Sequence, residues 1–218
     1  MGRLRTGCLN MGDLGQISRF SAPDYWHIEL IMRALLPLLF FLAQPFWDTK
    51  PPERWTDGEI YTIRNNSPWA QAVAPDPVVV AYLATAAPVE MAEAELRLRM
   101  KKNASRMPEP DPDYIDYLRE NRESQFVLAI TYPTLRGLGK AEENRRMEEE
   151  TVMVIGRKTY PFAGHFPPTP SDPVLRLIFD REVKPSDRAV SFRLYLPGLN
   201  FPEREVEFRV KDLMFQGK

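Results

Sequence analysis

The chain has 218 residues and a formal net charge of −1, with 44% hydrophobic and 27% charged residues. These values are typical of an ordinary globular domain, and they offer no basic excess for nucleic acid and no acidic tail. Its single cysteine, Cys8, excludes an internal disulfide framework and a thiolate metal site. We therefore expect no nucleic-acid partner, no metal and no cofactor.

An apolar run from Ala34 to Ala43 follows Arg33. Its ten residues are too few to cross a bilayer, which takes about 20. A basic residue before a short apolar segment is the pattern of a secretory signal peptide. We predict that residues 1–43 are an upstream segment plus signal peptide outside the mature fold, with no stable membrane span after cleavage. The predicted location is then periplasmic or extracellular. An uncleaved anchor or a buried helix, which Pro37 would interrupt, are the alternatives.

Residues 44–76 form an arm rich in proline and tryptophan. Thr56 and Glu59 have the spacing of a capping box and predict a short helix after Thr56. Tryptophans flank this helix, and we expect them to anchor the arm by burial, with a ligand platform as the alternative. The candidate interaction residues of the arm are Trp47, Trp55 and Trp69. No catalytic residue is assigned.

Residues 77–218 are predicted to form a single α+β domain. The clearest helix spans about 88–103, where acidic residues come early and basic residues late, and Glu93–Arg97 and Glu95–Arg99 have i,i+4 spacing. Asp111 is expected to cap a second helix that carries Ile115 and Leu118 inward.

Short β-branched and aromatic segments predict a mainly antiparallel sheet of five or six strands, for which a sandwich is one arrangement. A change of hydrophobic phase predicts a bulge or bend near Lys211 and Asp212. Three other segments are interpreted as a connector at 71–77, an exposed helical excursion at 133–150 and a loop at 160–173. The strand candidates span 78–83, 125–132, 151–157, 174–179, 189–196 and 205–215.

Catalytic residue types are scarce after residue 43. His165 is the sole histidine there, in a segment interpreted as a loop, and neither a Gly-x-Ser-x-Gly turn nor a phosphate-binding glycine loop is present. The acidic residues at 111, 113 and 116 do not match a calcium loop, which needs glycine at position six and glutamate at position twelve. These observations favour a non-enzymatic protein, and leave dispersed carboxylates as the enzymatic alternative.

Two segments of the arm, Trp55-Thr56-Asp57-Gly58-Glu59 and Ser67-Pro68-Trp69-Ala70, resemble an uncharacterised group of secreted bacterial proteins. Residues 86–89 and 213–218 are similar to further stretches of that group, and residues 54–57 are remotely similar to the GWxTD-domain proteins of the bacterial envelope. The resemblance implies export and brings no activity. We therefore predict an exported accessory or binding module of the cell envelope. The alternatives are a subunit of a larger assembly, with envelope proteins as partners, or a hydrolase of envelope glycan; the oligomeric state is left open.

Overall fold

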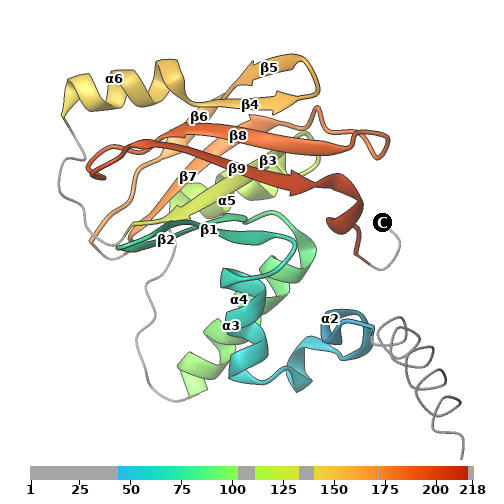
Figure 1. Ribbon diagram of the computed structural model, residues 1–218. Coiled ribbons are helices and arrows are strands. Elements are labelled where there is room, and N and C mark those ends of the chain that lie inside the picture. The colour runs from blue at the N-terminus through green and yellow to red at the C-terminus, as the bar shows by residue number, and fades with distance from the viewer. Residues whose placement is uncertain (1–43, 103–110, 133–139, 171, 216–218) are drawn as a thin grey trace, which may run out of the picture. The chain divides into compact units, whose positions relative to one another are not determined.

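Two antiparallel sheets pack face to face in the computed structural model, which describes residues 44–102, 111–132, 140–170 and 172–215 (Figure 1). The signal-peptide prediction lies outside the described residues. The five-stranded sheet has the order β1 (Ala70–Pro75), β2 (Val78–Leu83), β3 (Gln125–Thr131), β7 (Val174–Asp180), β6 (Gly164–Phe166). The four-stranded sheet has the order β5 (Lys158–Pro161), β4 (Val152–Ile155), β8 (Ala189–Tyr195), β9 (Glu203–Arg209). The predicted antiparallel α+β fold is confirmed.

The core between the sheets follows from the alternation of side chains along the strands. In β3, Phe126, Leu128 and Ile130 face the four-stranded sheet, and in β8 Phe192 faces back toward them. Phe192 packs edge to face on Phe179 of β7, with ring centroids 5.1 Å apart. Burial of these large side chains is the main favourable term for a sandwich of this size.

Helices cover the other face of the five-stranded sheet, so the chain from Pro45 has three layers (Figure 1). Val127 and Ala129 of β3 belong to the cluster that contains Ile63 of α3 (Asp57–Asn65) and Val89 and Ala92 of α4 (Ala87–Lys102). The helices are α2 (Phe46–Thr49), η1 (Pro52–Arg54), α3 (Asp57–Asn65), α4 (Ala87–Lys102), α5 (Pro112–Asn121), α6 (Ala141–Glu150) and η2 (Val210–Asp212). None of those in the described ranges is long and apolar enough to cross a bilayer.

Local signals predicted the helices of this layer well. The capping box of Thr56 and Glu59 is present at α3. In α4 the Glu95–Arg99 pair lies at 2.8 Å and the Glu93–Arg97 pair at 3.9 Å. The Asp111 side chain accepts a hydrogen bond from the amide of residue 113 and caps α5 as expected.

Of the two α5 side chains predicted to face inward, Leu118 packs against the core and Ile115 does not. Ile115 is 39% exposed, whereas Tyr114 is buried. Tyr114 and Leu118 are four residues apart and share a helix face, whereas Ile115 lies about 100° around the helix from Tyr114, at the edge of that face. The Tyr114 ring instead packs under the guanidinium of Arg176, 4.3 Å from its centroid.

Three strands were missed because the proline residues in and around them favoured an interpretation as a connector or a loop. Residues 71–77, interpreted as a connector, contribute most of β1, and the loop predicted at 160–173 contains part of β5 and all of β6. His165 therefore lies in a strand, opposite Leu177 of β7. Pro75 and Pro161 both stand at the ends of edge strands, where the missing amide proton removes no necessary ladder bond.

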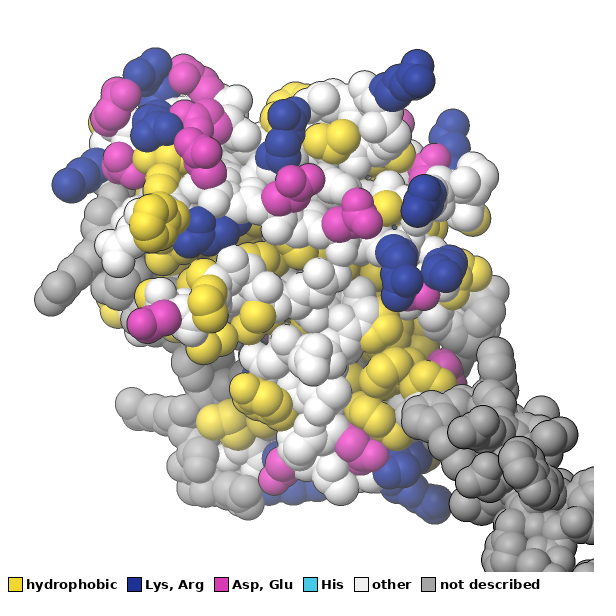
Figure 2. Space-filling view, in the orientation of Figure 1, with side chains coloured by type: hydrophobic (Ala, Val, Ile, Leu, Met, Phe, Trp, Pro, Cys, Tyr) yellow, Lys and Arg dark blue, Asp and Glu magenta, His cyan; other side chains and the backbone are white. Residues whose placement is uncertain are grey.

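Two further predictions were a helical excursion after β3 and a bend after β9. The bend predicted near Lys211 and Asp212 is confirmed, because β9 ends at Arg209 and η2 follows directly. The exposed helical excursion predicted at 133–150 is confirmed in its described part, where α6 is a helix with mostly exposed side chains, but Met147, which is 2% exposed, anchors this helix to the core. The outer surface of α6 carries mixed acidic and basic side chains (Figure 2).

Candidate functional site

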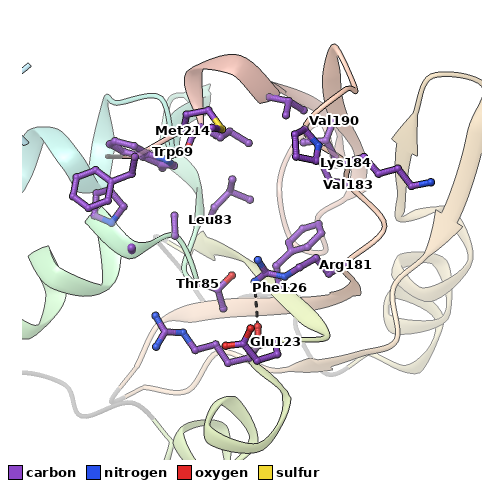
Figure 3. A pocket seen from close by; sticks show the side chains of 18 residues that line it. Trp69, Leu83, Thr85, Glu123, Phe126, Arg181, Val183, Lys184, Val190 and Met214 are labelled. Carbon is purple, nitrogen blue, oxygen red and sulfur yellow. Dashed lines mark hydrogen bonds between the residues drawn. The ribbon is translucent and has the colours of Figure 1, made fainter. Parts of the chain in front are cut away.

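A pocket of about 890 Å³ opens at the end of the sandwich where β3 and β8 begin (Figure 3). Its walls come from the end of β2 and the start of α4, the α5–β3 turn, the β7–β8 loop and the segment after β9. These segments meet because antiparallel strands place the end of one strand beside the start of its neighbour. The pocket is within the size range of small-molecule sites.

Most of the pocket wall is apolar, since thirteen of its eighteen lining residues carry apolar side chains. Leu83, Phe126 and Val190 are core residues of the sandwich that also line the pocket. Met214, which is 45% exposed, completes this wall from the C-terminal segment. The open end of the hydrophobic core therefore forms the interior of the pocket.

Arg181 provides the polar side of the pocket, where its guanidinium lies beside the α5–β3 turn (Figure 3). Its Nη2 donates to the carbonyl oxygens of Arg122 at 3.1 Å and Gln125 at 3.3 Å. Within the described ranges Arg181 forms no ion pair with a carboxylate. A cation that is held in place in this way is available to an anionic ligand.

Thr85 lines the same side of the pocket. Its Oγ1 accepts a hydrogen bond from the amide of Val127 at 3.2 Å, which fixes the hydroxyl oxygen. A hydroxyl has one donor besides its acceptor capacity, so the Thr85 proton remains available to a ligand.

Arg122 also lines the pocket, but it is paired with Glu90 of α4. Burial raises the pKa of the Glu90 carboxyl, and the attraction of Arg122 opposes that rise only in part. The three cationic residues of the lining are Arg122, Arg181 and Lys184, against one acid, Glu123. After the Glu90 pair is taken into account, the pocket keeps a small positive surplus.

The predicted interaction residues of the arm lie together, although they do not all reach the pocket. Trp55 and Trp69 are 2% and 1% exposed, and Trp47 is half-buried with its ring 5.4 Å from that of Trp69. Trp55 Nε1 donates to the carbonyl of Lys50, and Trp69 Nε1 donates to that of Leu213. Of the three, Trp69 alone lines the pocket. A partner-binding role for the arm stays a prediction.

A second group of polar residues lies between the five-stranded sheet and the helices. Arg176 and Asp172 are both buried and form an ion pair at 2.6 Å. Tyr82 donates to Glu93 at 3.3 Å, and burial raises the pKa of both the Tyr82 and the Tyr114 hydroxyl. Because these groups satisfy one another beneath the helices, we interpret the group as structural.

The pocket lining brings no catalytic set together. It contains one carboxylate, Glu123, and no histidine, so the paired acids of a glycoside hydrolase are not assembled there. Across the described ranges, no cluster of three metal-ligating side chains occurs.

Sequence reasoning missed the pocket residues Thr85, Phe126 and Arg181 as site residues. They come from separate segments and belong to no motif, so only the fold brings them together. Trp69 was found because a tryptophan beside a helix is conspicuous in the sequence.

The fold and the pocket define a small α+β sandwich with a ligand-sized site at one end. No protein-family model, curated protein or solved structure matches the chain. The resemblance to secreted bacterial proteins therefore stays a prediction, and the site itself must support any functional proposal.

Proposed function

We propose that the protein is a non-enzymatic binding module that takes up a small, largely apolar ligand in the end pocket. The observation that supports this proposal is the pocket of about 890 Å³, in which Leu83, Phe126 and Val190 of the core face an open end. Apolar pockets with a few fixed polar groups are the usual form of ligand sites. These core side chains are at most 8% exposed, so an apolar ligand gains free energy mainly by covering the more exposed apolar wall, such as Met214, which is 45% exposed.

The two other functions considered above receive less support. A carboxylate-dependent hydrolase needs a second acid opposite Glu123, which the lining lacks. A subunit held through the arm would need exposed tryptophans, and Trp55 and Trp69 use their surfaces within the fold.

A matched pair of variants tests the binding proposal. Ala87 is exposed, begins α4 and lines the pocket, so Ala87→Trp fills the pocket mouth. Ala141 is also exposed and begins α6, so Ala141→Trp adds the same bulk outside the pocket. Fluorescence titration with the neutral dye Nile red should show saturable binding to the wild type, weakened at least about tenfold by Ala87→Trp.

The control variant Ala141→Trp should bind Nile red as the wild type does. The proposal would be overturned if the dye did not saturate a single site, or if both tryptophan variants bound it equally well.

We also propose that the ligand is bound outside the cytoplasm, in the periplasm or extracellular space. The apolar run from Ala34 to Ala43 after Arg33 supports this location. Cell fractionation with N-terminal sequencing tests it: a mature chain that begins near residue 44 is expected in the exported fraction. A cytosolic chain that retains residues 1–43 would contradict export and leave the binding proposal unaffected.

A further inference from the structure

We infer that the end pocket of one molecule binds Phe201 of a second copy of this chain, so that copies associate head to tail. This inference rests on the proposed function, because it uses the same pocket, and it adds a partner to that pocket. Phe201 lies in the hairpin between β8 and β9, at the end of the sandwich opposite the pocket.

Phe201 is an aromatic side chain that the fold leaves in solvent. At 75% exposed, it is the most exposed of the large hydrophobic side chains in the described ranges. A phenylalanine presents of order 200 Å² of surface, and burying it in an apolar site is favourable. Covering this ring would gain free energy that the single molecule leaves unused.

The hairpin that carries Phe201 is held in a fixed shape. The amide of Leu196 donates to the carbonyl of Pro202 at 2.8 Å, which closes the loop. Gly198 has a φ of 80°, a conformation that favours glycine, and Leu199 packs against the core. A ring presented by an ordered loop loses less conformational entropy when it binds.

The ring cannot reach the pocket of its own molecule. The pocket lies where β8 begins and the hairpin follows its last residue, so the seven residues of β8 separate the two. At about 3.3 Å per residue, the strand holds them roughly 20 Å apart. The pocket can therefore receive this ring only from another copy.

The pocket provides walls that suit a phenylalanine ring. Its lining includes three aromatic residues, Trp69, Phe126 and Phe215. The rings of Trp69 and Phe215 already pack edge to face, with centroids 6.3 Å apart. Such T-shaped contacts are among the arrangements that aromatic rings prefer, so an incoming ring can extend this pair. The volume of about 890 Å³ leaves room for part of the hairpin as well.

The charges of the two ends are complementary. The helix α6 packs over the end of β8, where Glu143 accepts from the hydroxyl of Tyr195, and it carries five glutamates and two arginines (Figure 1). The exposed Glu203 adds a carboxylate beside the hairpin. At the pocket, the three cationic lining residues stand against Glu123 and Glu90, so one positive charge is left. The acidic end of one copy and the weakly basic end of the next therefore attract each other.

A contact between two different surfaces leaves each pair with a free ring at one end and a free pocket at the other. Association of this kind continues past a dimer, in contrast to a two-fold contact, which ends there. The net charge of −1 on the whole chain adds little repulsion between copies.

Two variants of the full chain separate the ring from the pocket. Phe201→Ser removes the ring, and Ala87→Trp fills the pocket mouth. Analytical ultracentrifugation between about 10 μM and about 1 mM should show the wild type growing beyond a dimer, and each variant associating at least about tenfold more weakly. Tyr61→Ser, at a side chain of α3 that is 68% exposed, is the matched control and should associate as the wild type does.

A mixture of the two variants should restore a single contact. Ala87→Trp keeps the ring and Phe201→Ser keeps the pocket, so together they should form a one-to-one dimer that cannot grow. Addition of Ala87→Trp should also displace Nile red from Phe201→Ser. The double variant, which lacks both features, should not displace the dye.

The outcomes separate this inference from the proposed function. A wild type that stays monomeric, association that survives either variant, or a mixture that forms no dimer overturns the inference and leaves the pocket to a small ligand. A mixed dimer without Nile red binding overturns only the uptake of a small ligand. Absence of both the mixed dimer and dye binding overturns both proposals.

Discussion

The two ends of the sandwich are finished in different ways. Where β8 ends, α6 packs over the core through Met147, and the Tyr195 hydroxyl bonds both Glu143 and Arg146 at 2.9 Å. Where β8 begins, loops and the first turn of α4 surround an open pocket lined by Val190. One end is closed by a helix, and the other remains accessible.

The strands themselves do not account for this difference. Along β3, Phe126 at the open end is 8% exposed, and Ile130 near the closed end is 0% exposed. Both side chains are of the kind that fills a core. The difference comes from the segments that follow the strands, because α6 supplies a buried side chain at one end and the loops at the other end supply a rim. The connections therefore decide which end can bind a ligand.

The largest expected effect compares one methionine at each end. Met147→Ala should lower the free energy of unfolding by roughly 2–5 kcal/mol, because it leaves a cavity beneath α6. Met214→Ala at the open end should change it by no more than about 0.5 kcal/mol, since that side chain is half in solvent. Urea denaturation measures both. A comparable loss at the two ends would show that the open end is as tightly packed as the closed end.

The next effect concerns the wall of the open end. Trp69→Phe removes the hydrogen bond from Nε1 to the Leu213 carbonyl, and should lower the free energy of unfolding by about 1–3 kcal/mol. Because Leu213 and Met214 line the pocket, Nile red binding should weaken as well. Trp47→Phe is the control, since Trp47 lies outside the pocket lining. An unaltered dye affinity in Trp69→Phe would show that the C-terminal segment does not shape the site.

Local sequence signals were sufficient for much of the fold. The cap at Thr56, the charge gradient of α4 and the alternation in β8 all act within a few residues, so they can be read from one segment. The strands β1, β5 and β6 were missed because each of them forms against a single partner strand. A short edge strand with proline has little preference of its own until its partner is in place.

The candidate site could not be predicted in the same way. Trp69 and Leu213 are joined by a hydrogen bond across 144 positions in the sequence. The two carbonyls to which Arg181 donates belong to the distant residues Arg122 and Gln125. No spacing in the sequence encodes such contacts. The importance of Met147 was hidden for a related reason, because its helix is otherwise almost entirely charged.

A smaller effect tests how firmly α6 closes its end. Tyr195→Phe removes the hydrogen bonds to Glu143 and Arg146, and should lower the free energy of unfolding by about 0.5–1.5 kcal/mol. Amide hydrogen exchange in α6 should become faster, while exchange in α4 should not change. Tyr61→Phe, at a side chain that is 68% exposed, is the control. Unchanged exchange in α6 would leave Met147 as its main anchor.

The smallest effect is a difference in pH dependence between the two ends. At the open end, burial raises the pKa of Glu90 above its ordinary 4.5, so its contribution to stability is present at low pH and is lost as the pH rises toward neutrality. The free energy of unfolding of Glu90→Gln, relative to that of the wild type, should therefore be higher at pH 7 than at pH 4. Urea denaturation at the two pH values measures this difference.

At the closed end, Glu142 provides the matched control with the opposite sign. Its hydrogen bond with Arg145 lowers the pKa of the Glu142 carboxyl, so its contribution is present above its ordinary pKa and is lost on acidification. The free energy of unfolding of Glu142→Gln, relative to that of the wild type, should therefore be lower at pH 7 than at pH 4. If the stability of both variants relative to the wild type changed in the same direction between pH 4 and pH 7, burial would not control the pKa of Glu90. The open end would then be better solvated than its contacts indicate. Opposite shifts would locate the desolvated carboxylate beside the pocket, in its ion pair with the lining residue Arg122.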